Sequence, residues 1–213
     1  MRSFELKVVA IVANPEPNSL TQAMGNALLN GAAEGGALTD LIDLNSEHFN
    51  PVYSLEDRRY YLEQGPLPAD VAALQQRIVD ADVLAFVFPL YWFSMPAVMK
   101  GFFDRVLCRR FAYLKGGVPG VLAGKKVKLI VLCGGEEETF RVDGVDQAID
   151  VQICQRTLRD YCGITDIEKV YIDGLIMGNM DEDIRKELKE QLFRISVMGR
   201  QLVVGSSDNE QRD

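Results

Sequence analysis

The chain has 213 residues, of which 47% are hydrophobic and 25% charged, and its formal net charge at pH 7 is −8. A chain of this size buries enough surface to fold as one domain without disulfide or metal staples. The acidic balance disfavours nucleic acid and anionic membrane surfaces as partners, because both repel negative charge.

In the first part of the chain, short apolar runs alternate with segments whose apolar residues have the spacing of a helix. Residues 7–12 are a β-branched run that predicts a strand, and the apolar residues that follow the turn at 14–18 have the spacing of a helix. Residues 38–44 predict a second, short strand. The polar stretch 45–68 is longer than most loops, so we expect it to serve a function or to contain a short element.

The rest of the chain continues this alternation. We predict a helix at 69–81, a strand at 83–88, a helix at 96–107, a strand at 126–133, a helix at 145–162, a strand at 167–173 and a helix at 181–204. On the helix at 145–162, the spacing places Ile149, Ile153, Leu158 and Tyr161 inward. We expect one domain over residues 1–204 and a frayed polar tail over 205–213.

Five predicted strands that alternate with five predicted helices indicate an α/β fold: a doubly wound parallel sheet in a three-layer αβα arrangement. The flavodoxin-like strand order 2-1-3-4-5 fits this element count best. In that fold the ligand crevice lies at the carboxyl ends of strands 1, 3 and 4. The search for chemistry therefore narrows to three loops.

Several classes of protein are disfavoured by what the sequence lacks. Its four cysteines include no CxxC pair and its only histidine is His48, so neither a zinc site, a disulfide framework nor a histidine-dependent triad is predicted. The first residues lack a signal-peptide cleavage pattern, and Pro89 and Pro96 interrupt the longest apolar run. We expect a cytoplasmic protein that is not integral to a membrane; peripheral association stays open.

The first loop, residues 14–21, precedes a helix start, where unpaired amides and a partial positive charge suit an anion. No Lys or Arg occurs from Val8 to Asp57, so a phosphate there would be held by backbone N–H groups and by Asn18, Ser19 and Thr21. The alternative is that Ser19 or Asn18 only caps the helix.

The second loop, residues 89–96, places Tyr91, Trp92 and Phe93 directly after a buried strand. Two prolines stiffen this segment, so that its peptide groups and aromatic faces can meet a planar heterocycle. The alternative is that the aromatic side chains plug the sheet edge or a subunit interface.

The third loop begins with Cys133, Gly134 and Gly135, and paired glycines let a backbone approach a ligand closely. The three carboxylates at 136–138 follow one another directly, and successive side chains seldom converge on one metal ion. We therefore predict a solvated acidic loop and no metal site.

A planar cofactor that carries one phosphate would use all three loops. The sequence has no GxGxxG, and Pro119 stands where a Walker A loop needs its first glycine. These features favour flavin mononucleotide (FMN). FAD remains the alternative, because the stretch 45–68 could shelter an adenine.

Residues 88–106, with the sequence FPLYWFSMPAVMKGFFDRV, resemble the signature of the NAD(P)H:quinone oxidoreductases, the DT-diaphorase-like enzymes of flavodoxin-like fold. The resemblance continues at 45–51, at 111–113 and at the Gly134–Gly135 turn, and covers most of residues 7–200. It implies a homodimer with FMN or FAD at the subunit interface, and two-electron reduction of quinones by NAD(P)H in a ping-pong hydride transfer. Nitro and azo compounds would be side acceptors.

The resemblance also implies site residues. The cofactor-binding residues would be Asn14, Asn18, Ser19, Leu20 and Thr21 in the first loop, Pro89, Leu90, Tyr91, Trp92 and Phe93 in the second, and Cys133, Gly134 and Gly135 in the third. Trp92, Phe93 and Phe140 would bind the substrate. No side chain is implied as a catalytic acid or base, because the cofactor carries the chemistry.

The chain departs from the family at three positions. Asn14 stands where many members have a histidine, and Phe140 and Asp146 stand where the mammalian enzymes have a tyrosine and a histidine near the reduced flavin. The charge relay proposed for those two residues is therefore not reproduced here.

Two other functions stay open at this point. Some relatives are ancillary subunits of potassium efflux systems, and a flavodoxin-like one-electron carrier is a further alternative. The choice between NADH and NADPH is also open, with five arginines available to meet a 2′-phosphate: Arg58, Arg59, Arg109, Arg110 and Arg141.

Overall fold

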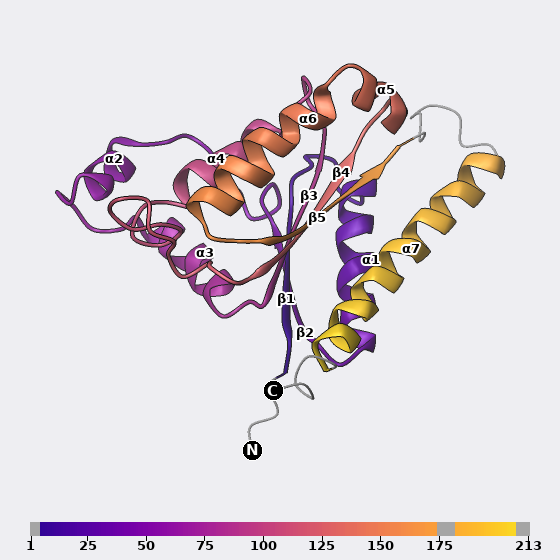
Figure 1. Ribbon diagram of the computed structural model, residues 1–213, viewed down its shortest axis with the longest axis horizontal. Coiled ribbons are helices and arrows are strands. Elements are labelled where there is room, and N and C mark those ends of the chain that lie inside the picture. The colour runs from indigo at the N-terminus through magenta and orange to yellow at the C-terminus, as the bar shows by residue number, and fades with distance from the viewer. Residues whose placement is uncertain (1–4, 174–181, 208–213) are drawn as a thin grey trace.

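The apolar β-branched runs form five parallel strands (Figure 1). In the computed structural model, which describes residues 5–173 and 182–207, they are β1 (Lys7–Val12), β2 (Leu38–Asp43), β3 (Val83–Pro89), β4 (Lys126–Leu132) and β5 (Asp166–Ile172). Every neighbouring pair is parallel, and the order is β2-β1-β3-β4-β5. The predicted flavodoxin-like topology is confirmed.

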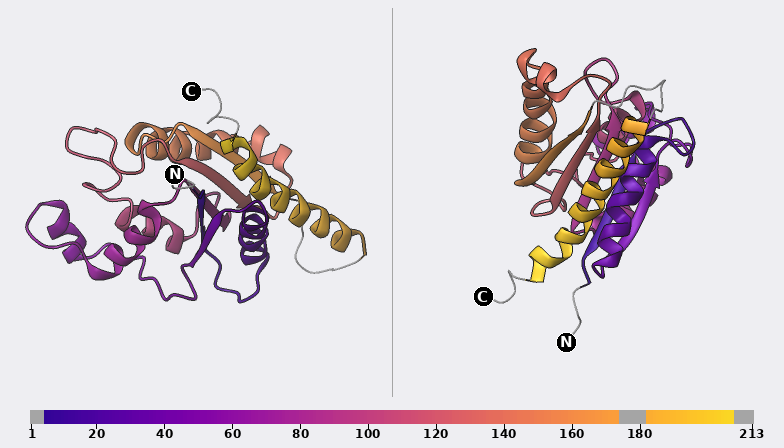
Figure 2. Two further views of the ribbon diagram at one scale, coloured as in Figure 1. Left: turned by 90° about the horizontal axis from the view of Figure 1, so that it is seen from below. Right: turned by 90° about the vertical axis from the view of Figure 1, so that its right-hand side faces the viewer.

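Helices cover both faces of this sheet. They are α1 (Leu20–Glu34), α2 (Leu55–Tyr61), α3 (Ala69–Val79), α4 (Ala97–Arg105), α5 (Glu137–Val142), α6 (Val145–Ile149), the π-helix η1 (Asp150–Tyr161) and α7 (Glu182–Ser207). Figure 2 shows α1 and α7 together on one face and α6 with η1 on the other. The arrangement has the three predicted layers.

The core is divided by the sheet because successive strand residues point to opposite faces. On β1, Val9 and Ile11 pack with the helices of one face, whereas Val8 and Val12 pack toward α1 and α7. Residues 83–88 of β3 are all buried, as expected for a parallel strand covered on both sides. Within the described ranges, no helix is both long and apolar enough to cross a bilayer.

Three details of the element prediction are wrong. The stretch 133–144, expected to be a loop, contains the short helix α5, whose six residues are too few to show helical periodicity. Tyr161, expected to face inward, is 52% exposed, because a π-helix has a wider turn than the α-helix spacing assumed. The last helix continues to Ser207, past its predicted end; residues 208–213 lie outside the described residues.

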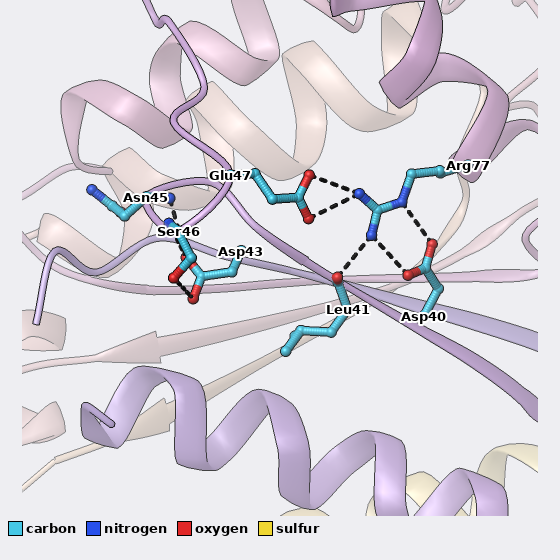
Figure 3. Close-up of polar contacts among 7 residues, drawn as sticks. All are labelled: Asp40, Leu41, Asp43, Asn45, Ser46, Glu47 and Arg77. Atoms are coloured by element: carbon cyan, nitrogen blue, oxygen red, sulfur yellow. Dashed lines mark hydrogen bonds and ion pairs between the residues drawn. The ribbon is translucent and has the colours of Figure 1, made fainter. Parts of the chain in front are cut away.

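The long stretch 45–68 contains α2, as the prediction allowed. The start of this stretch, at Glu47, is connected to β2 by one arginine (Figure 3). Arg77 on α3 donates to both carboxylate oxygens of Asp40 at 2.8 Å, to the Leu41 carbonyl at 2.8 Å and to Glu47 at 2.8 and 2.9 Å. The hydrogen bonds from Arg77 hold the pKa of Asp40 below its ordinary value.

Replacing Arg77 with Met should lower the free energy of unfolding. Because 31% of the Arg77 side chain is exposed, we expect a loss of only about 1–2 kcal/mol. Asp40 has a lowered pKa in the folded state, so its contribution is complete above its ordinary pKa of 3.8 and is lost as the pH falls through the folded value. Urea unfolding at several pH values should therefore show that the difference in free energy of unfolding between wild type and Arg77→Met becomes smaller in acid.

The matched control is Arg156→Met, which removes an arginine that pairs with Asp160 on the surface of η1 at 3.3 Å. We expect this change to cost less than about 0.5 kcal/mol. Equal losses for the two variants, or a gap that stays constant down to pH 3, would contradict the assigned role of Arg77.

Candidate functional site

The three predicted loops meet at the carboxyl-terminal end of the sheet, because the strands that precede them are parallel neighbours. The ladder continues past the strand ends: Ala13 N–H donates to the Val87 carbonyl at 3.1 Å, and Leu90 N–H donates to the Leu132 carbonyl at 2.8 Å. The turns at 13–19, 90–96 and 133–136 therefore start at the same level of the sheet. The predicted convergence of these loops is present.

The turn after β1 leads into a capped helix. Ser19 Oγ accepts from Gln22 N–H, and the Gln22 side chain accepts from Ser19 N–H, both at 3.3 Å. The capping alternative is thus confirmed for the hydroxyl of Ser19. Among the described residues, the N–H groups of Asn18, Leu20 and Thr21 have no acceptor, so the free donors of this turn belong to the backbone.

Two of the predicted phosphate ligands brace this turn with their side chains. Asn14 donates from Nδ2 to Thr21 Oγ1 at 2.9 Å and accepts from Glu16 N–H at 3.0 Å. Thr21 is fully buried, so its hydroxyl is not presented to a ligand. Asn18 is exposed and has a φ of 60°, a left-handed conformation that asparagine tolerates better than most residues.

A buried carboxylate at the end of β2 holds the same turn from the other side, and the sequence analysis missed it. Asp43 accepts from Asn45 N–H at 3.1 Å, from Ser46 N–H at 3.0 Å and from the Ser46 hydroxyl at 2.9 Å (Figure 3). It also accepts from the side chain of Gln22, in the first turn of α1. The Ser-x-x-Gln spacing at 19–22 is a capping-box signature that could have pointed to Gln22.

The turn after β3 is a two-residue hairpin that displays its aromatic side chains. Tyr91 and Ser94 exchange both backbone hydrogen bonds, at 3.0 and 3.2 Å. Trp92 and Phe93 have φ values of 50° and 61°, the pattern of a type I′ turn, where Asn and Gly are the usual residues. Trp92 is 94% exposed, so it does not plug the sheet edge of its own chain.

The turn after β4 is open on the side of its glycines. A Cβ placed on Gly134 would have no heavy atom of the described residues within 4 Å apart from its chain neighbours, whereas one on Gly135 would lie 3.4 Å from the Phe140 ring. In the described part of the chain, neither glycine N–H has an acceptor. This turn therefore combines two N–H donors that have no described acceptor with open space beside Gly134.

Cys133 contributes backbone rather than reactivity to this turn. Its side chain is buried, and burial raises the pKa of the Cys133 thiol to about 12. The thiol therefore stays protonated at neutral pH and is not a nucleophile. The acidic residues that follow start α5 and do not converge; no group of three His, Cys, Asp or Glu residues suited to a metal ion occurs in the described ranges.

The arginines proposed for a 2′-phosphate do not gather at these turns within one chain. Arg58 and Arg59 lie on α2, at the opposite end of the molecule from α5 (Figure 1). Arg109 pairs with Glu63 at 2.8 Å, and Arg110 lies over the Tyr60 ring at 3.8 Å. Arg141, on α5, is paired with Glu137 at 2.5 Å.

Comparison with known proteins agrees with this geometry. A family model described as flavodoxin-like fold matches residues 6–194. The chain belongs to this flavodoxin-like family. It is 34% identical to human ribosyldihydronicotinamide dehydrogenase (quinone) over 161 residues, which are 66% of this chain and 68% of the human protein.

Solved structures of the same fold include two flavodoxin-like oxidoreductases. The NAD(P)H:quinone oxidoreductase of Methanothermobacter marburgensis has a TM-score of 0.82 and 27% identity, over 93% of this chain and 97% of that one. The FMN-dependent NADH-azoreductase of Bacillus anthracis, solved with FMN, has a TM-score of 0.69 and 15% identity, over 92% and 99%, and shows the fold alone. The predicted family and enzyme class, NAD(P)H:quinone oxidoreductase, are confirmed.

The strained hairpin predicts a gain of stability on mutation. Phe93→Gly removes a bulky side chain from a left-handed conformation and should raise the free energy of unfolding by about 1 kcal/mol. The ring is 61% exposed, so little apolar burial is lost. Ser94→Gly is the control, because Ser94 has no positive φ and should lose stability. A lower free energy of unfolding for Phe93→Gly than for wild type, measured by denaturant unfolding, would argue against strain at this turn.

Proposed function

We propose that the chain binds one flavin across the three turns and reduces quinones with electrons from NAD(P)H. The proposal rests on the open turn at Gly134 and Gly135, whose N–H groups have no acceptor among the residues that the structure describes. These groups lie at the same end of the sheet as the exposed Trp92 and as the amides of Asn18 and Leu20, which also have no described acceptor. A flat ring with hydrogen-bond acceptors along one edge and a phosphate on a tail would use all of these groups.

The phosphate end would be held at the start of α1. Its N–H groups and the helix dipole favour an anion there. Asp43 and Asn14 fix the turn by hydrogen bonds, and neither side chain adds positive charge to the site. FMN supplies the single phosphate that this turn explains, and FAD is the alternative.

The ring end would lie between the second and third turns. The Gly134 and Gly135 N–H groups would donate to the pyrimidine edge and stabilise negative charge there, while Trp92, Phe93 and Phe140 would offer faces for the ring and the acceptor. When bound, the flavin would supply the two-electron hydride chemistry that links NAD(P)H to the quinone, with ping-pong kinetics. The chain contributes orientation and exclusion of water, and no side-chain acid or base.

We further propose a homodimer that shields the exposed apolar residues. Beside Trp92 and Phe93, the large apolar side chains that lie exposed on and around α2 and the segment after α4 are Val52, Tyr53, Leu55, Tyr61, Leu62, Leu114, Val118 and Val121. Faces of this kind mark interaction surfaces. A pair would also bring the α2 arginines of one subunit to a second chain. We also propose a cytoplasmic location.

The function is tested by Gly134→Val with the purified, FMN-loaded protein. Wild type should be yellow, oxidise NAD(P)H only when a benzoquinone is present, and give parallel double-reciprocal lines. The Cβ of the valine would meet no described atom within 4 Å, and Gly134 has no positive φ, so the unfolding midpoint of the flavin-free protein should stay nearly unchanged. The dissociation constant for FMN, from fluorescence quenching, should rise more than about tenfold.

Colourless wild-type protein that stays inactive with added FMN and FAD would refute the enzyme. An unchanged FMN affinity in Gly134→Val would instead refute the placement of the ring. A stable semiquinone on photoreduction would favour the one-electron carrier, and co-purification with a potassium transporter would favour the ancillary subunit.

A further inference from the structure

A buried tyrosine lies directly behind the turn that carries Gly134 and Gly135. Tyr171, on β5, is 4% exposed, and its ring stacks on Phe140 with centroids 6.5 Å apart and planes 22° apart. Phe140 in turn lies 3.4 Å from a Cβ placed on Gly135. A continuous stack therefore runs from the sheet to the open turn.

The hydroxyl of Tyr171 is held by a charged pair. It donates to Asp146 Oδ1 at 2.9 Å, and the same oxygen lies 2.5 Å from Lys169 Nζ. Lys169 also donates to Asp150 Oδ1 at 2.7 Å and has only 12% of its side chain exposed. These contacts join the first turn of α6 and the start of η1 to β5.

The protonation states of this group are fixed at neutral pH. Burial alone would raise the pKa of Asp146, but the hydrogen bonds from Lys169 and Tyr171 lower it below its ordinary value. Burial and the hydrogen bond to Asp146 raise the pKa of Tyr171. Tyr171 is therefore a phenol that donates to a carboxylate, and it has no proton to spare for a reactant.

The helix α5 needs contacts with other elements to hold its position. None of its six residues is buried, and a helix of this length is not stable by itself in water. Its first N–H group donates to the Asp173 carboxylate at 2.7 Å, and Phe140 is its contact with the core. Whatever fixes Phe140 therefore fixes the wall beside Gly135.

We propose that Tyr171, through its hydrogen bond to Asp146, is a positioning residue that holds Phe140 and α5 as the rigid wall of the acceptor pocket. The proposal rests on the proposed function for the identity of the pocket. Tyr171 is covered by its neighbours and touches no reactant, so its effect is on the fit of the acceptor and not on the transfer of electrons.

The test uses the flavin-loaded full chain with Tyr171→Phe, which keeps the ring and removes the hydroxyl. We expect KM for a bulky naphthoquinone to rise about fivefold to tenfold, with kcat and the dissociation constant for FMN within about twofold of wild type. Amide deuterium exchange over residues 137–142 should become about tenfold faster. Phe140→Leu, which keeps an apolar side chain but removes the stacked ring, should reproduce both effects.

Asp146→Asn is the second variant, and Asp160→Asn is its control. Asp160 lies on η1 and pairs with Arg156 on the surface, so the loss of its charge should change neither KM nor the exchange of residues 137–142. Asp146→Asn should raise KM and accelerate exchange as Tyr171→Phe does. This variant keeps the proposal testable if Tyr171→Phe fails to fold.

Unchanged exchange at 137–142 in both variants would overturn the proposal. A fall in kcat at constant KM would also overturn it, because it would make Tyr171 part of the chemistry. Deuterium exchange needs no turnover. Faster exchange in a protein that reduces no quinone would leave the positioning role standing while the proposed function fails.

Discussion

The site depends on backbone N–H groups at the carboxyl ends of the parallel strands that find no acceptor in the described part of the chain. A parallel ladder pairs the strands, but the turns that follow β1, β3 and β4 leave the strand direction and lose their ladder partners. The amides of Asn18, Leu20, Gly134 and Gly135, which have no acceptor among residues 5–173 and 182–207, are costly unless water or a ligand accepts from them. The fold thereby places several N–H donors at one end of the sheet, and in our proposal a flavin accepts from them.

The protein holds these donors in place with hydrogen bonds between side chains of different elements. Asp43 links the end of β2 to the first turn of α1 by a hydrogen bond from Gln22. Arg77 connects β2 to α3 (Figure 3). Tyr171 and Asp146 support the third turn from behind. The hairpin at Trp92 and Phe93 instead keeps two bulky residues in a left-handed conformation. Rigid support on two sides and a strained, exposed tip between them are features that functional sites often combine.

The fold could be predicted from the sequence because its signals are local. Continuous apolar runs such as 83–88 and helical spacing after each turn fix the five strands and their order, since right-handed crossovers leave few alternatives. The convergence of the three loops follows from that topology. The helix α5 and the inward placement of Tyr161 could not be predicted correctly, because a six-residue helix has no periodicity and a π-helix breaks the usual one.

The candidate site was predictable at the level of the loops but not of the side chains. Nothing in the sequence distinguishes Thr21, which is fully buried and braces its turn, from Asn18, which is exposed. The roles of Asp43 and Tyr171 depend on contacts between elements that lie far apart in the chain. Long-range hydrogen bonds of this kind leave no periodic pattern in a single sequence, so only the structure brings them together.

The central claim is that amides at the start of α1, without cationic side chains, hold the phosphate of a flavin. Its most direct test compares the affinity of the cofactor-free protein for riboflavin 5′-phosphate and for riboflavin by fluorescence quenching. Charge-assisted bonds to two or more N–H groups predict that the phosphate tightens binding by about a hundredfold. Equal affinities for the two compounds would contradict the account.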